Sequence, residues 1–257
     1  NKTAKFFSHF YNQSSYLIDR KIKRQDNTFN LNPFKNDSET ALGLQSNFRN
    51  VLFFNRGKQH YTTSYTFLTN SSRNILTVGF IANSLKSHQL HFNHKFETSW
   101  LINLQTSLET NASESENFIS KNYKLDEERL NPKLSYLLND NVRFDLFYQF
   151  TKKENSIGDL EVLNQQKYGA SFAINSNQKA AISGEFNLFS NAFEGNQNSP
   201  VGYQMLEGLQ PGRNLTWSIL AQKKITKYLD LNLTYFGRKS ETSKTIHTGN
   251  VQLKAYF

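Results

Sequence analysis

Hydrophobic and polar residues alternate along most of this chain. In the last eight residues, NVQLKAYF, every second residue from Val251 to Phe257 is apolar, and those between are polar except Tyr256. The same period of two recurs in NVRFDLFYQF (141–150) and in WLINLQTSLET (100–110). Side chains of a β-strand point alternately to opposite faces, so this pattern predicts strands with one apolar face.

Counted back from the C-terminus, the alternation predicts about twelve strands. They are expected near residues 3–18, 39–54, 58–71, 83–96, 99–112, 128–138, 141–153, 165–175, 178–191, 212–225, 228–241 and 245–257. Tight connectors such as NRGK and NDN alternate with longer polar stretches at 24–38, 72–82, 111–127, 154–164 and 192–211. This rhythm is typical of a transmembrane, antiparallel up-and-down β-barrel, with short periplasmic turns and longer extracellular loops.

A soluble β-sandwich or barrel would also alternate, so the two faces have to decide between the classes. Aromatic residues gather near strand ends on the apolar face: Trp100, Tyr136, Tyr148, Trp217, Tyr235 and Phe257. Such positions match the aromatic girdles of membrane barrels. The opposite face carries Asn, Gln, Ser, Thr and charged residues, and is too polar for a dry core. We therefore favour the membrane barrel.

Composition narrows the function classes further. The chain has 30 Lys and Arg against 21 Asp and Glu, a formal net charge of +9, yet the basic residues are spread along it. Because no basic face is concentrated, we expect no nucleic-acid binding. The absence of cysteine excludes disulfides and thiolate sites. No apolar run approaches the ~18 residues of a membrane-spanning helix.

The C-terminal segment from Tyr203 to Phe257 resembles the end of large outer-membrane barrels of the Bacteroidota. Its final strand looks like the C-terminal strand of Gram-negative outer-membrane proteins, which ends on an aromatic residue. The resemblance implies a location in the outer membrane and recognition of the last strand by the barrel-assembly machinery. It gives Val251, Leu253 and Phe257 the role of an assembly signal, and it implies no substrate.

One barrel domain over residues 1–257 accounts for the whole length. Since the sequence starts without Met and runs directly into an aromatic segment, we expect it to be the C-terminal portion of a longer chain. Its strands would then form part of a larger barrel. Expected partners are outer-membrane lipid and lipopolysaccharide, the barrel-assembly machinery and other outer-membrane proteins.

Charged residues on the polar face are predicted to face the lumen. They are Arg49, Glu109, Arg143, Asp145, Lys167, Glu185 and Asp230. Their mixed signs fit a lumen closed by ion pairs as well as a weakly selective pore. A barrel of about twelve strands is too wide to be filled by side chains alone, so its lumen would be a narrow channel or plugged by loops.

The longest predicted connector, 192–211, holds apolar residues in a region that should be aqueous. These residues are Tyr203, Met205, Leu206 and Leu209. Exposed apolar clusters mark contact sites. We therefore expect this segment to be ordered, either as a plug in the lumen or as a contact for another outer-membrane protein.

Catalytic and metal-binding patterns are weak in this sequence. The six histidines include no pair at i and i+2, and the GxSxG motif of a serine hydrolase is absent. The acidic stretches at 112–118 and 125–129 lack the spacing of a calcium loop. We expect no enzyme, cofactor or metal. The predicted function is a membrane-embedded subunit of a larger outer-membrane complex, with a narrow solute channel as the alternative and a lipid-active enzyme as the second alternative.

Overall fold

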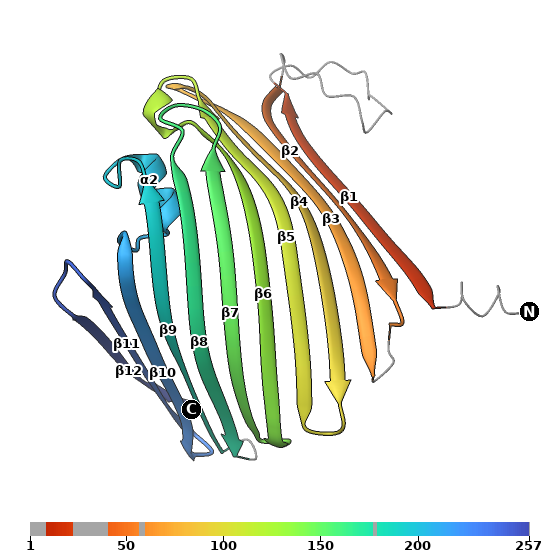
Figure 1. Cartoon of the computed structure of the whole chain (residues 1–257), viewed down its shortest axis with the longest axis vertical. Helices are drawn as coiled ribbons and strands as arrows, with labels where there is room; N and C mark the ends of the chain where they lie inside the picture. The colour runs from red at the N-terminus through yellow and green to blue at the C-terminus, as the bar shows by residue number, and fades with distance from the viewer. Residues whose placement is uncertain (1–8, 23–40, 57–59, 177–178, 257) are drawn as a thin grey trace, which may run out of the picture.

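The computed structural model describes residues 9–22, 41–56, 60–176 and 179–256. They form a twelve-stranded antiparallel sheet whose strands follow one another in sequence order (Figure 1). The strands are β1 (Phe10–Ile22), β2 (Ala41–Phe54), β3 (Tyr61–Leu76), β4 (Gly79–Phe96), β5 (Trp100–Ser115), β6 (Tyr123–Asn139), β7 (Val142–Asn155), β8 (Val162–Ser176), β9 (Ala180–Glu194), β10 (Gly212–Thr226), β11 (Leu229–Ser240) and β12 (Ile246–Ala255). The predicted all-β, up-and-down class with twelve strands is confirmed.

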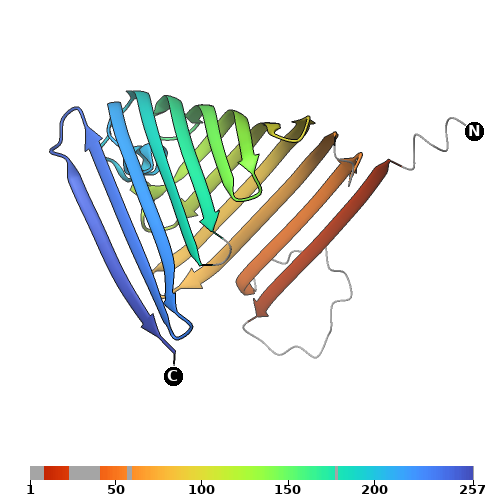
Figure 2. The same ribbon diagram turned by 90° about the horizontal axis from the view of Figure 1, so that it is seen from below.

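The sheet curls around a hollow and stays open between its first and last strands (Figure 2). Within the described ranges, β1 pairs with β2 alone and β12 with β11 alone. Besides the strands, the described residues contain two short helical elements, η1 (Ile119–Lys121) and α2 (Pro200–Leu206). No helix among the described residues is long and apolar enough to cross a membrane.

The convex face of the sheet is apolar and exposed. Residues paired directly across neighbouring strands share a face, so the register connects Leu104 with Phe92 and Leu134 with Leu146. Leu146 is 61% exposed although it lies in the interior of a strand. Other large exposed side chains on this face are Leu52, Leu90, Leu134, Tyr168, Phe186, Ile219, Leu233, Val251 and Leu253. So much exposed apolar surface requires a partner that is not water.

The concave face is polar and better buried. One row of cross-strand partners runs from Arg49 on β2 through Ser87 and Glu109 to Glu127 and Lys153 on β7. The buried polar side chains of this face include Ser87, Ser107, Ser135, Asp145, Thr151, Lys153, Gln165, Asn187 and Asn214. A soluble barrel has the opposite arrangement, with its apolar face inside.

Two glycines let aromatic rings lie flat across the sheet. A Cβ added at Gly169 would stand 2.1 Å from the ring of Phe147, and one at Gly237 would stand 2.1 Å from the indole of Trp217. Both distances are far shorter than a van der Waals contact, so a side chain at either position would overlap the ring. The glycines therefore leave the space that these rings fill on the concave and convex faces, respectively.

The strands are longer than the hydropathy pattern predicts. Residues 72–82, expected to be a loop, belong mostly to β3 and β4, which meet at the two-residue turn Thr77–Val78. The predicted loops at 111–127 and 154–164 are also partly strand. At the end of β3, the stretch TNSSRN (69–74) carries polar residues on both faces, so the alternation disappears there although backbone pairing continues. Residues 3–8 of the first predicted strand and the whole of the predicted loop 24–38 lie outside the described residues.

Candidate functional site

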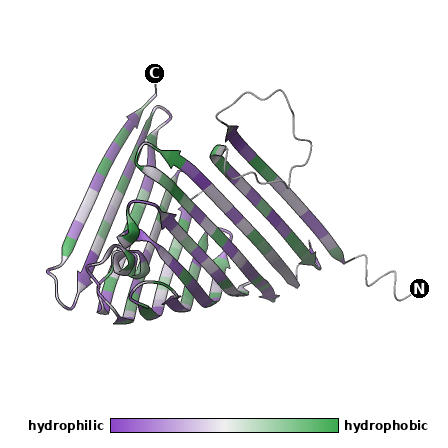
Figure 3. Ribbon diagram, turned by 90° about the horizontal axis from the view of Figure 1, so that it is seen from above, coloured by the Kyte–Doolittle hydropathy of each residue, from purple (hydrophilic) through white to green (hydrophobic). Residues whose placement is uncertain are grey.

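The segment between β9 and β10 folds onto the concave face at one end of the sheet. We call this end of the sheet the mouth. Figure 3 shows α2 within the curl of the sheet. We use the name plug for residues 195–211, which contain α2. The name inner wall denotes the concave face of β2–β12.

Local sequence signals start and stop the helix of the plug. The Ser199 hydroxyl accepts a hydrogen bond from the Gly202 amide at 2.9 Å, and Pro200 occupies the first turn. Both features favour a helix start. The helix ends at Glu207, which adopts the left-handed conformation (φ 54°), and Gly208 follows with φ 76°. A turn with these dihedrals redirects the chain towards β10.

An apolar cluster fixes α2 to the wall. Met205 is fully buried and Leu206 is 2% exposed. Their cluster consists of Leu125, Leu163, Val201, Met205 and Leu206, with Tyr123 and Phe193 packed against it. Leu125 lies at the start of β6 and Leu163 near the start of β8, so the wall presents an apolar patch where the helix docks.

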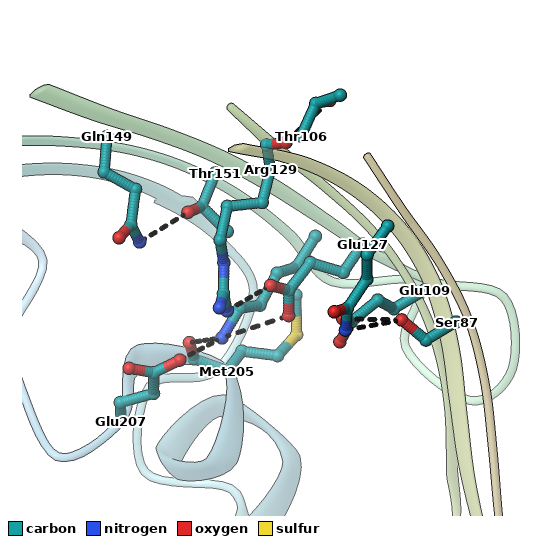
Figure 4. A network of polar contacts seen from close by, with 11 residues as sticks. Ser87, Thr106, Glu109, Glu127, Arg129, Gln149, Thr151, Met205 and Glu207 are labelled. Carbon is teal, nitrogen blue, oxygen red and sulfur yellow. Dashed lines mark hydrogen bonds and ion pairs between the residues drawn. The ribbon is translucent and has the colours of Figure 1, made fainter. Parts of the chain in front are cut away.

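A buried lysine of β7 links the plug to the wall electrostatically. Figure 4 shows Met205 and Glu207 of the plug beside Glu127 and Arg129 of the wall. The Lys153 ammonium on β7 donates to the Met205 carbonyl at 3.2 Å and to Glu207 Oε1 at 2.5 Å. It also lies 3.7 Å from Glu127 Oε2 on β6, and Arg129 pairs with the same carboxylate. Because Lys153 is only 5% exposed, these oxygens replace the water that its charge has lost.

Two asparagines hold the end of the plug. Asn191 donates to the Gln210 carbonyl at 2.9 Å, and Asn214 donates to the same oxygen at 2.7 Å. The Gln210 amide donates in return to Asn214 Oδ1 at 3.1 Å. The plug is thus tied to β9 and β10, its neighbours in sequence, as well as to β6–β8.

Farther along the inner wall, charged residues form small ion-pair groups. Asp145 on β7 accepts from Arg143 Nε at 2.7 Å and lies 3.4 Å from Lys133 Nζ. Lys167 on β8 lies 3.7 Å from Glu185 on β9. The groups combine opposite signs, so this part of the wall has no long stretch of a single charge.

The seven residues predicted to face the lumen all lie on the concave face by register. Glu109 accepts from Ser87 at 2.9 Å and from Gln89 at 3.2 Å. Asp230 pairs in register with Lys224 on one side and Lys254 on the other. That this face encloses a lumen stays a prediction.

The predicted assembly signal is only partly described. Val251 and Leu253 lie on the convex face of β12 and are 69% and 60% exposed. Phe257 lies outside the described residues. Their recognition by assembly machinery stays a prediction.

The structure separates the four residues predicted for the plug or partner loop. Met205 and Leu206 pack against the inner wall, Leu209 is half-buried, and Tyr203 is 68% exposed. Sequence reasoning missed the wall side of this contact. Leu125 and Leu163 are apolar residues on the mostly polar concave faces of β6 and β8, a signal that could have located the docking patch.

Histidines form no metal site among the described residues. No group of three or more His, Cys, Asp or Glu in those ranges is placed to hold an ion. His88 is hydrogen-bonded to Tyr65 at 2.7 Å, and His247 to Tyr235 at 2.8 Å. Both histidines lie on the convex face, where their partners are aromatic hydroxyls.

No protein-family model matches the chain, and no curated protein matches it in sequence. Similar solved structures include a NanC porin (TM-score 0.42, 12% identity, 84% of this chain and 97% of that one). The translocator domain of autotransporter NalP from Neisseria meningitidis has a TM-score of 0.35, 12% identity, and coverage of 84% and 82%. The beta domain of the Bordetella autotransporter Brka has a TM-score of 0.37 and 8% identity. The match covers 97% of this chain and 99% of that one.

Proposed function

We propose that this chain is a non-enzymatic outer-membrane β-barrel whose inner wall lines a narrow path for polar solutes, restricted at the mouth by the plug. The observation that carries the proposal is the distribution of polarity. The convex face exposes large apolar side chains, and the concave face buries amides, hydroxyls and ion pairs. Lipid suits the first face and water the second.

The position of the plug favours a solute path over a contact loop. The apolar residues that would have met a partner, Met205 and Leu206, are already covered by Leu125 and Leu163 of the same chain. The plug also places a helix on the concave side of the curled sheet, where it narrows the mouth. Among the large apolar side chains of α2, only Tyr203 stays exposed.

Planar-bilayer conductance tests this function. The intact chain is expected to give a small conductance, and replacing residues 196–208 by a short Gly-Ser linker should enlarge it. The matched control shortens the connector at 241–245, which is exposed at the same end of the sheet, and should leave the conductance unchanged. No conductance from either the intact chain or the plug deletion would reject the solute path.

A membrane-embedded subunit of a larger complex is the second candidate, and the sheet edges favour it. Backbone N–H and C=O groups at a free edge cannot stay unpaired in lipid, because each costs several kcal/mol there. The strands β1 and β12 either pair with each other, which closes a twelve-stranded barrel, or pair with strands from elsewhere. Native mass spectrometry of the detergent-purified chain separates these cases, since a self-closed barrel is expected as a monomer.

A further inference from the structure

We infer that the inner wall of β9–β12 contains a binding site for a small hydroxylated carboxylate of the sugar-acid class. This inference rests on the proposed solute path and specifies which solutes the path favours. The site is a hollow of about 480 Å³ that is lined by side chains of all four strands. This volume is typical of pockets for small molecules.

Two neighbouring cross-strand rows build the hollow. In the first row, Asn187, Thr216 and Arg238 are aligned across β9, β10 and β11. In the second row, the partners are Glu185, Ser218, Phe236 and Thr248. Since direct partners share a face, all seven side chains leave the sheet on the concave side. The register thus gathers amide, hydroxyl, carboxylate, guanidinium and phenyl groups in one place.

The charges of the hollow favour an anion. Glu185 is paired with Lys167 at 3.7 Å and accepts from Asn187 at 2.8 Å, so its charge is balanced within the wall. Arg238 has no such partner, because none of the ion pairs among the described residues includes it. A guanidinium binds a carboxylate in a bidentate manner, which makes this class of anion the best match.

The remaining groups favour hydroxyls on the same solute. The Glu185 carboxylate accepts hydrogen bonds, while Ser218 and Thr248 can both donate and accept. Strands about 4.8 Å apart and a rise of about 3.4 Å per residue place the backbones of Glu185 and Arg238 roughly 12 Å apart. After both side chains extend into the hollow, one sugar-sized molecule can reach both ends. Phe236 lies beside this span and offers a ring face for the carbon skeleton.

Calorimetric titration of the folded, detergent-solubilised chain with glucuronate tests the site. Glucuronate should bind at least tenfold more tightly than glucose, which lacks the carboxylate. The Arg238→Gln variant should lose about tenfold or more in affinity, because a hydrogen bond to a charged group is worth about that factor. The control is Lys239→Gln, which removes a cation from the next residue on the opposite face and should bind like the parent chain.

The outcomes separate this inference from the function on which it rests. Equal binding of glucuronate and glucose, or unchanged affinity in Arg238→Gln, overturns the sugar-acid site. Conductance without glucuronate binding leaves the solute path standing and rejects the site alone. Heat-modifiable migration of both variants on gels checks that each has folded, so a loss of binding cannot be attributed to misfolding.

Discussion

The contact between the plug and the inner wall can be tested by one truncation on α2. Met205 is fully buried against Leu125 and Leu163, whereas Tyr203 on the same helix is 68% exposed. Replacing a buried Met by Ala costs about 2–5 kcal/mol, because packing is lost and a cavity remains. The cost of Tyr203→Ala should stay within about 0.5 kcal/mol, as for other surface substitutions.

Hydrogen exchange of the amides at 200–206, followed by mass spectrometry, measures the effect directly. The loss in Met205→Ala falls on the docking of the plug, so it increases the population of the undocked state. At about 1.4 kcal/mol per tenfold change, exchange should accelerate at least about 30-fold. Amides of β7 report the stability of the sheet and should be unaffected. If Met205→Ala and Tyr203→Ala exchange at the same rate, α2 does not dock as described.

Three further predictions concern the ion pairs of Lys153, the close-packed Gly237 and the chain end. Lys153→Met should weaken plug docking by about 1–3 kcal/mol. This is less than the loss of a fully buried ion pair would cost, because Glu207 is 57% exposed. The same hydrogen-exchange measurement should show no effect for Lys152→Met, which changes the opposite face of the strand. Gly237→Leu should destabilise the folded chain by about 1–3 kcal/mol in urea titrations, because the new side chain would overlap Trp217. Gly249→Leu should be tolerated, because a Cβ there meets nothing closer than 4.0 Å. Equal urea midpoints of the two variants would contradict the described packing. Deleting Phe257 should reduce the heat-modifiable barrel in the outer membrane, and undiminished assembly would remove its role as a signal.

Most of the fold can be predicted from the alternation of apolar and polar residues in the sequence. Most strands have one face rich in Leu, Phe, Tyr and Ile, so the number of strands and the face of residues such as Leu146 and Asp145 follow from a period of two. The ends of the strands do not follow. In TNSSRN at 69–74 the residues are polar on both faces, and only backbone pairing with β2 and β4 shows that the strand continues.

The candidate site was predictable only in part. Ser199 and Pro200 are a recognisable helix start, and Met205 and Leu206 are conspicuous in a polar segment. The partner of Lys153, however, is Glu207, 54 residues away in the sequence. Such a pair depends on how the plug folds back over three strands. The grouping of Glu185, Phe236 and Arg238 likewise depends on the exact register of β9–β11, which alternation alone leaves undetermined.

The most direct test of the central claim compares arginine on the two faces of β7 in lipid vesicles. Leu146 lies about 10 Å from the tight-turn end of the strand, given ~3.3 Å per residue and a tilt of ~40°, and is therefore near the middle of an apolar band about 25 Å tall. The free energy of unfolding, from urea titrations, should fall by about 2–4 kcal/mol in Leu146→Arg and by about 1 kcal/mol or less in Gln149→Arg on the concave face. In a soluble protein, arginine at a position that is 61% exposed would change stability by about 0.5 kcal/mol at most. Equal and small losses in the two variants would contradict a lipid-facing convex surface and a watery inner wall.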